Sequence, residues 1–413
     1  MTAEVQSLQG LLFDLLSSVR PVDHCRVIIL DDDDWSVLMR MVRQHRLGPM
    51  LHWQLKRGQS HLDIPVKIRS VLAQSFSKST FRSLILQSEL LKVHRILTQA
   101  KIPYIALKGA YLGYHAYPQA GLRPLRDLDI LVPKELVLSA FNFLIEAGFT
   151  RIDKHMGNSS IAMQSFHHLP PLLSSSKQVI VELHVRLNSD LLQADQSEEL
   201  GFWERSIKVP LNQQQITFTS PTDLLLHMII HAVYGHEFDN GPLLLSDLAF
   251  LMATQPIDWD LFWTLAQQEK KVRGCILALK LTQRYWDIGF IDWPSEFKSI
   301  QDDDIEIALD VAKNLMLQNF DSRRDKYFKS AINRAQGFGA IFRILLDRIF
   351  PSKIVMASQY PIFADDWRQY FWYTVLWRRQ LIERLPKLWQ TWRQPHMDQE
   401  IKYSVELKQW LEK

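Results

Sequence analysis

Two aspartates interrupt an apolar segment of the chain. Asp127 and Asp129 lie one residue apart in RDLDILVP, whose Leu, Ile and Val content is otherwise that of a buried strand. Because side chains alternate across a strand, both carboxylates project from one face, while Leu128 and Ile130 project from the other. Like charges this close repel each other, and burial adds a desolvation cost. This face of the strand therefore needs solvent or cations beside it.

Two explanations fit this pair of acids. A divalent cation would offset both costs, and Mg²⁺ favours carboxylate oxygens while keeping positions open for water and phosphate. Alternatively, the acids lie at a strand end, where they are solvated or paired with Arg123 and Arg126. The D-x-D triplet is common, so its surroundings have to decide.

The preceding segment carries groups that favour phosphate. IPYIALKG, residues 102–109, reads as a short strand that ends at Gly109, and AYLGYHAY opens a helix directly after it. Free amides at a helix start bind phosphate, and Lys108 adds a positive charge at the same point. Arg123 and Arg126 precede the acids and could neutralise a polyphosphate with their forked guanidinium groups.

A further acid interrupts the apolar segment QVIVELHVRL. Glu182 and His184 share one strand face there, while Val181, Leu183 and Val185 share the other. If the strands are neighbours, Glu182 joins the two aspartates in a set of three carboxylates. Three such acids beside a Gly turn with Lys and Arg are typical of a two-metal phosphoryl-transfer site.

These segments together resemble a known superfamily. A Gly turn, a helix, a D-x-D strand and a third strand acid are similar to the nucleotidyltransferases that include DNA polymerase β and the aminoglycoside nucleotidyltransferases. More narrowly, IALKGAYLGYHAY, RPLRDLDILV and VELHVRL, between Lys101 and Leu187, resemble the bacterial family of uncharacterised nucleotidyltransferases. The turn departs from the superfamily pattern, since it has Lys108-Gly109 in place of Gly-Gly or Gly-Ser.

The resemblance implies roles for the residues of these motifs. It implies that Asp127 and Asp129 hold Mg²⁺ or Mn²⁺, that Glu182 is a further metal ligand or the general base, and that Lys108 and Gly109 bind the phosphates of a nucleoside triphosphate such as ATP. The implied reaction transfers a nucleoside monophosphate (NMP) to a hydroxyl acceptor. The sequence does not identify this acceptor, which could be a small molecule, a sugar, a peptide, a protein or a tRNA.

Two alternatives remain at this point. A D-x-D glycosyltransferase also holds a metal and a nucleotide-sugar, but it needs a larger sheet and leaves Lys108 and Glu182 unexplained. A non-catalytic relative would keep nucleotide binding without turnover. An activity assay is needed to exclude the non-catalytic relative.

Histidines are further candidates for the acceptor site or for a supporting role. His184 shares a strand face with the third acid, and His168, in the pair His167-His168, could reach the acceptor or a phosphate. His227 and His231 are four residues apart and share a helix face, where paired histidines can chelate a metal. Their helix is apolar and lacks the Glu of H-E-x-x-H, which favours core histidines or an acceptor-orienting role.

The pattern of the chain changes twice, which predicts three regions. Residues 1–97 read as an N-terminal helical region, 98–215 as the nucleotidyltransferase core and 216–413 as a C-terminal helical domain. A length of 413 residues fits two or three such units. The predicted class is α+β, with a small mixed sheet between helical regions.

Several elements follow from periodicity and from start and stop signals. Residues 31–58 predict helix, with acids at the front, bases at the back and a stop at Gly58. Residues 79–101 continue the helical pattern. Residues 134–149 predict an amphipathic helix that ends at Gly148, and 165–178 a hairpin arm or loop.

Bulk composition excludes several classes of protein. The chain is 47% hydrophobic and 23% charged, as in an ordinary soluble globular protein, and a net charge of +3 does not indicate nucleic-acid binding. Cys25 and Cys275 are too few for a disulfide framework and favour a cytoplasmic location. No apolar run approaches the roughly 18 residues of a transmembrane helix.

The last part of the chain is basic and rich in aromatic residues. Residues 321–413 contain 17 Lys and Arg against 10 Asp and Glu. Basic aromatic helices can contact membrane surfaces or RNA. The alternative is an amphipathic helix that packs its aromatic side chains on the rest of the domain.

Overall fold

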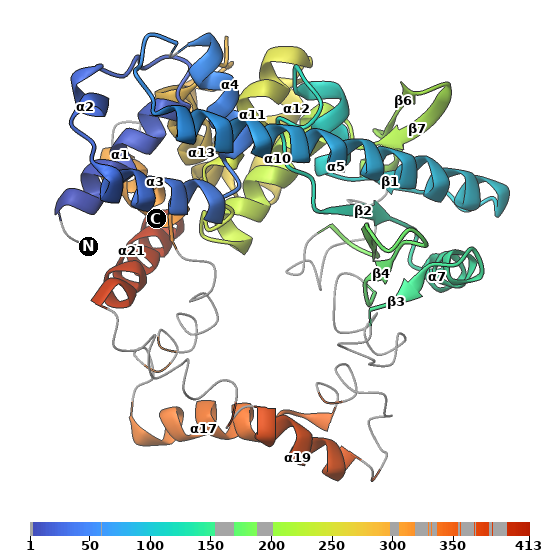
Figure 1. Cartoon of the computed structure of the whole chain (residues 1–413). Helices are drawn as coiled ribbons and strands as arrows, with labels where there is room; N and C mark the ends of the chain where they lie inside the picture. Colours follow the sequence, from blue (N-terminus) through green and yellow to red (C-terminus); the bar gives the residue numbers. More distant parts are fainter. Residues whose placement is uncertain are drawn as a thin grey trace.

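The computed structural model of the chain describes residues 3–58, 60–152, 169–187, 201–297, 305–318, 337–353, 369–379 and 395–413, with a few isolated positions besides. Helices precede and follow a central sheet (Figure 1). The principal elements, in chain order, are α1 (Ala3–Leu16), α2 (Cys25–Ile28), α3 (Asp32–Gln44), α4 (Gly48–Arg57), α5 (Val66–Gln99), β1 (Ile105–Ala106), α6 (Gly109–Tyr111), the π-helix η1 (Leu112–Ala116), β2 (Asp127–Leu131), α7 (Val137–Glu146), β3 (Thr150–Arg151), β4 (Leu172–Leu173), β5 (Ile180–His184), β6 (Ile207–Leu211), β7 (Gln214–Phe218), α10 (Pro221–Ile230), the π-helix η2 (His231–Gly235), α11 (Leu243–Thr254), α12 (Trp259–Gln268), α13 (Val272–Tyr285), the 3₁₀ helix η3 (Ser295–Phe297), α15 (Ile305–Met316), α17 (Phe338–Ile349), α19 (Gln369–Arg379) and α21 (Pro395–Glu412).

The strands form one mixed sheet in the order β3-β4-β5-β2-β1-β7-β6. The pairs β2/β5 and β1/β7 are parallel, and the other neighbours are antiparallel. The predicted α+β class is therefore confirmed. Strands β1, β2 and β5 lie in the three apolar segments predicted as strands, and β3, β6 and β7 are additional.

Helices α5 and α7 cover one face of the sheet. Helix α5 contacts β2 and α7, and α7 contacts β5. The apolar side chains on this face, Leu128, Ile130, Val181 and Leu183, are at most 1% exposed. Since strand side chains alternate, this packing turns the acidic positions of β2 and β5 to the opposite face.

The segment predicted as helix over 31–58 is two helices. Asp31 caps α3 by accepting hydrogen bonds from the amides of Asp33 and Asp34, and α3 then ends at Gln44. Arg46, with φ 56°, takes the left-handed conformation that usually requires glycine after a helix. A non-glycine residue pays about 1–2 kcal/mol for this conformation.

Other predicted elements agree in outline. Helix α5 contains 79–99 but already begins at Val66. Helix α7 is followed by Gly148 with φ 90°, as predicted. The described part of 165–178 is a hairpin arm, since β4 pairs antiparallel with β5. Helix gives way to strand between α5 and β1, and strand to helix between β7 and α10. The division into three domains at 97 and 215 stays a prediction.

The C-terminal helix α21 docks back on the molecule. Lys408 Nζ lies 2.8 Å from a carboxylate oxygen of the buried Glu237, and Arg273 Nε donates to the Trp410 carbonyl at 2.7 Å. Both cysteines are free thiols; Cys25 is exposed and Cys275 is buried. Of the helices in the described ranges, none combines the length and the apolar content that a bilayer crossing demands.

Candidate active site

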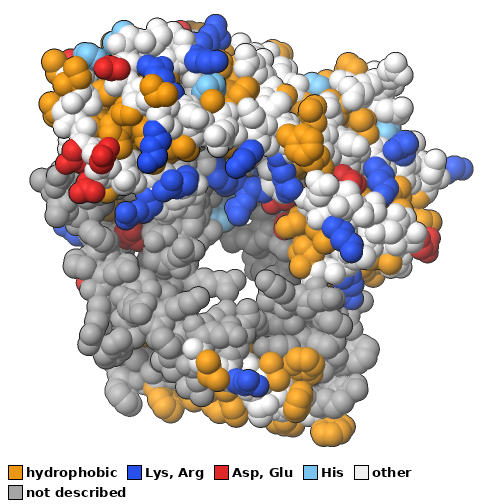
Figure 2. All heavy atoms as spheres, in the orientation of Figure 1, with side chains coloured by type: hydrophobic (Ala, Val, Ile, Leu, Met, Phe, Trp, Pro, Cys, Tyr) orange, Lys and Arg blue, Asp and Glu red, His pale blue; other side chains and the backbone are white. Residues whose placement is uncertain are grey.

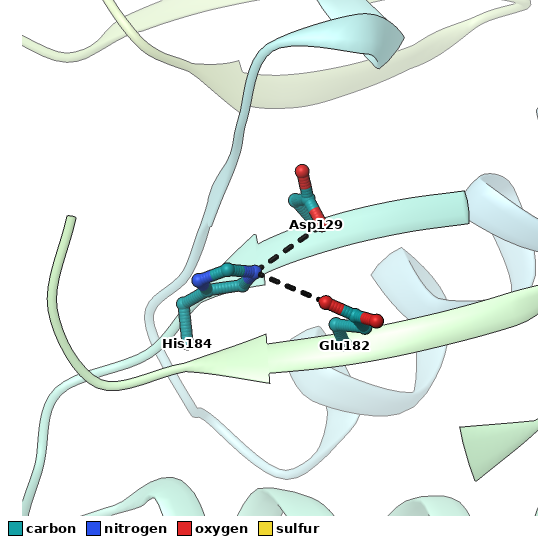
Figure 3. A group of neighbouring side chains, drawn as sticks. All are labelled: Asp129, Glu182 and His184. Atoms are coloured by element: carbon teal, nitrogen blue, oxygen red, sulfur yellow. Dashed lines mark hydrogen bonds and ion pairs between the residues drawn. The ribbon is translucent and has the colours of Figure 1, made fainter. Parts of the chain in front are cut away.

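The strand register brings two of the predicted acids together. Strands β2 and β5 run parallel, with Asp129 beside Glu182, Asp127 beside Ile180 and Leu131 beside His184. Both strands have the alternating pattern of buried apolar and half-buried polar residues that directs their acids to one face. The carboxylates of Asp129 and Glu182 therefore lie side by side on the face opposite α5 and α7 (Figure 3).

His184 completes a group of three potential metal ligands. Its Nε2 donates to Asp129 Oδ1 at 3.2 Å and lies 3.8 Å from Glu182 Oε2 (Figure 3). One ligand atom from each residue lies within 4.8 Å of the other two, and the described ranges hold no second group of this kind. Carboxylates suit Mg²⁺ and Mn²⁺, whereas an imidazole nitrogen is more usual with later transition metals.

The electrostatics of the acids also fit a divalent cation. Burial and the charges of Asp129 and Glu182 raise the pKa of Asp127 to about 6. Burial acts on Asp129 in the same direction, but the hydrogen bond from His184 and the charge of Lys108 hold the pKa of Asp129 well below its usual range. A cation that neutralises the group would favour full ionisation of all three acids.

The turn after β1 lies directly beside the acids. The Leu107 amide donates to the Asp129 carbonyl at 2.9 Å, which fixes this turn against β2. Lys108 follows with φ 41°, and its charge acts on both Asp129 and His231. Its side chain has neither a hydrogen-bond nor an ion-pair partner within the described residues. This half-buried cation is therefore available to an anionic ligand.

Gly109 and Arg123 are packed against each other. A Cβ atom at Gly109 would lie 2.7 Å from Arg123 Nη1, so the close approach depends on glycine. Arg123 Nε and Nη2 donate to the two carboxylate oxygens of Asp247 at 2.8 and 3.0 Å. The Arg123 guanidinium, which was predicted to neutralise a polyphosphate, thus pairs with the Asp247 carboxylate on α11. Its Nη1 makes neither of these two hydrogen bonds and is the nitrogen left for a ligand.

Arg126 is exposed and keeps its guanidinium free of described partners. Its carbonyl oxygen accepts a hydrogen bond from Arg82 Nη2 at 2.9 Å, and Arg82 Nη1 donates to the Gln178 carbonyl. One side chain of α5 thereby ties the approaches to β2 and β5 together. No local pattern marked Arg82, which reads as an ordinary polar residue of a helix.

Arg46 also belongs to this neighbourhood, although it comes from the N-terminal helices. Burial and the charges of Arg126 and Arg123 lower its pKa to about 10, while Asp127 and Asp247 act in the opposite direction. Positive side chains gather across the middle of the molecule in Figure 2. A signal was present in the sequence, since HRLGP places an arginine where a helix end favours glycine.

The histidines of α10 and η2 form a row of rings. His227 and His231 stack at 5.9 Å between centroids, and His231 meets His236 edge to face at 4.2 Å. Burial first, and then the charge of Lys108, lower the pKa of His231 far below its usual value. His231 is therefore a neutral base within electrostatic reach of Lys108, and its supporting role stays a prediction. His167 and His168 lie outside the described residues.

An apolar wall closes one end of the acidic face. Leu131, on the same face as the acids, packs in a cluster with Ile105, Leu107 and Phe202. The 201–205 segment is fastened by Arg205, which donates to both carboxylate oxygens of Asp223 at 2.9 and 2.7 Å. The site is therefore bounded by apolar side chains at one end and by cations at the other.

Paired acids on adjacent strands, next to a Gly turn that opens a helix, are features of the nucleotidyltransferase class. The sequence profile of the family described as "Uncharacterised nucleotidyltransferase" matches residues 31–287, which is more than half of the chain. The protein belongs to this family, and the match runs from α3 through α13. No curated protein matches the chain.

Proposed function

We propose that the protein is a metal-dependent nucleotidyltransferase that transfers NMP from a nucleoside triphosphate to a hydroxyl acceptor. The observation that carries the proposal is the register of β2 and β5, which pairs Asp129 with Glu182 and leaves Asp127 on the same face. Membership of a nucleotidyltransferase family favours this reaction over the glycosyltransferase alternative. The acceptor can be a small molecule, a sugar, a peptide, a protein or a tRNA.

Each side chain has a role in this proposal. Asp127, Asp129 and Glu182 would hold Mg²⁺ or Mn²⁺, which supplies charge stabilisation for the phosphoryl group and the leaving oxygens. Lys108 and the Gly109 amide bind the phosphates of the nucleotide. His184 orients the Asp129 carboxylate through its hydrogen bond at 3.2 Å.

The chemical step is an in-line displacement at the α-phosphorus. The acceptor oxygen forms a bond to this phosphorus while the bond to the bridging oxygen breaks, and pyrophosphate leaves. The acceptor proton passes to a carboxylate oxygen of Glu182, which is more exposed than Asp129 in the three-ligand group. His231, held neutral by burial, adds no positive charge of its own beside Lys108.

The test is transfer of label from each α-³²P nucleoside triphosphate, with Mg²⁺ or Mn²⁺, to the protein or to fractions of a cell lysate. Asp127→Asn and Glu182→Gln should each lower the rate by at least about a hundredfold while the fold stays intact. Glu135→Gln, which removes an exposed acid before α7, is the matched control and should keep full activity.

The outcomes separate the competing explanations. Full activity in Asp127→Asn would contradict the proposal. Binding of nucleotide without transfer of label to any fraction would favour the non-catalytic relative. Transfer of sugar from a nucleotide-sugar, lost in the same variants, would support the glycosyltransferase.

A further inference from the structure

Arg46 is a cation that the fold keeps at a conformational cost and leaves without a partner. Helix α3 ends in a Schellman motif, in which the Leu47 amide donates to the Val42 carbonyl at 2.8 Å and the Arg46 amide to the Arg43 carbonyl at 3.2 Å. Glycine is the usual residue at the Arg46 position, because φ is 56° there. Stability by itself therefore does not explain an arginine here.

The Arg46 side chain is half-buried and lies within electrostatic reach of four charged groups of the site. Arg123 and Arg126 act on it electrostatically, as do Asp127 and Asp247. Within the described residues its guanidinium makes neither a hydrogen bond nor an ion pair. Asp247, an acid within its range, already gives both oxygens to Arg123.

Two further cations that act on the aspartates of β2 are also without described partners. They are Lys108, which has φ 41° and acts on Asp129, and the exposed Arg126. Three cations without described partners thus interact with Asp127 or Asp129, and their charges offset the three negative charges of Asp127, Asp129 and Glu182. Each divalent cation held by the carboxylates would add two positive charges, and a polyanion would restore the balance.

We propose that Arg46, together with Arg126 and Lys108, forms a polyphosphate-binding site, so that the N-terminal helices complete the active site of the sheet. The inference rests on the proposed function and extends it to a residue outside the predicted core. Arginine suits the role because its planar fork donates two parallel hydrogen bonds to phosphate oxygens. The ligand is the triphosphate of the nucleotide or a free polyphosphate, which share this chemistry.

Calorimetric titration of the full-length protein with ATP, AMP and inorganic tripolyphosphate, each with Mg²⁺, tests the site. The decisive variant is Arg46→Gly, because glycine relieves the left-handed backbone and should leave Tm unchanged or higher. Its affinity for ATP and for tripolyphosphate should fall tenfold or more, the loss of a charged hydrogen bond. Its affinity for AMP should change less than twofold.

Arg43→Gln is the matched control, since it removes an exposed cation one turn earlier on α3 and should leave every affinity unchanged. If tripolyphosphate alone binds the wild type, and Arg46→Gly weakens it, the anion site stands while the nucleotide function fails. Wild-type affinities for ATP and tripolyphosphate in Arg46→Gly would overturn the inference. So would wild-type protein that binds neither compound.

Discussion

Asp247 is a buried carboxylate that positions two side chains of the site. It is 6% exposed, accepts two hydrogen bonds from Arg123 and accepts a third from the Tyr117 hydroxyl at 2.6 Å. Burial of a charge is tolerable only when its partners are equally well placed. This single residue on α11 therefore holds the loop before β2, and with it the first acid of the site.

Asp247→Asn should lower the free energy of unfolding by about 3 kcal/mol, because it leaves the half-buried Arg123 without a counter-charge. Urea denaturation followed by circular dichroism measures the change. The double variant Arg123→Met/Asp247→Leu should be more stable than the single variant, since it removes both charges together. A single variant within 0.5 kcal/mol of the wild type, roughly the scale of surface substitutions, would contradict this.

The lowered pKa of His45, next to Arg46, predicts that the protein loses stability in acid. Burial lowers its pKa from 6.5 to about 4, and the charge of Arg46 acts in the same direction. Below pH 6.5 His45 is protonated in the unfolded chain, whereas in the folded state it stays neutral until the pH approaches 4. The contribution of neutral His45 to the free energy of unfolding is therefore complete above pH 6.5. It is lost as the pH falls toward 4, by roughly 3 kcal/mol.

Chemical denaturation of the wild type and His45→Gln at pH 7.5, 6, 5 and 4 measures this contribution. The gap in unfolding free energy between the two proteins should change by roughly 3 kcal/mol over that range, with the variant losing less. A gap that stays constant with pH would show that His45 does not carry the effect.

At the scale of elements, the β1–α6 turn is the piece whose shape the site depends on. The Leu107 amide joins it to β2, and Gly109 lets Arg123 come within contact distance of the backbone. The π-helix η1 then carries Tyr117 toward α11, where Tyr117 meets Asp247. The turn thus connects the sheet to the C-terminal helices through a few tightly packed atoms.

Gly109→Ala should destabilise the protein by about 1–3 kcal/mol, because its Cβ would lie 2.7 Å from Arg123 Nη1 and 3.2 Å from Leu125 Cδ2. Differential scanning calorimetry measures the shift in Tm. Gly10→Ala in α1 is the control: no atom lies within 4 Å of its Cβ, and alanine should add up to about 1 kcal/mol of stability. Equal Tm values for the two variants would show that the contact at Gly109 is unimportant.

At the scale of the whole molecule, α17 and α19 present an apolar surface that is not buried. Phe342, Phe350, Tyr370 and Phe371 are each more than half exposed. The two helices bind each other, since Trp377 Nε1 donates to the Ile349 carbonyl at 2.7 Å. Hydrophobic side chains collect at the lower end of Figure 2, where Figure 1 shows these helices.

The same two helices carry the exposed cations Arg343 and Arg378. We therefore predict that this surface binds an anionic membrane. The full-length protein should sediment with phosphatidylserine vesicles at low salt and much less with phosphatidylcholine vesicles. Arg343→Glu/Arg378→Glu should weaken binding at least about tenfold. The variant Lys56→Glu/Lys67→Glu makes the same change of charge in α4 and α5 and should bind as the wild type. Equal sedimentation of all proteins would contradict the prediction.

The elements of the site with a local pattern are the ones that could be predicted from the sequence. Alternation put Asp127 and Asp129 on one face and Glu182 on the equivalent face of its own strand, and the structure has β2 and β5 at these places. Strands β3, β6 and β7 were not predicted, because short strands of mixed polarity lack a clear period of two. The prediction also joined α3 to α4, because the left-handed Arg46 that separates them lacks the usual glycine.

Which side chains share a face could be predicted from the sequence, because that depends on the fixed geometry of a strand and on immediate neighbours. Partners across long separations come from the tertiary fold. It gave Arg123 to Asp247, 124 residues away, and set Glu182 beside Asp129. It also placed Arg46, from the N-terminal helices, within electrostatic reach of Asp127 and Asp247. Such pairings depend on how whole helices and strands pack, and no local period of the sequence encodes them.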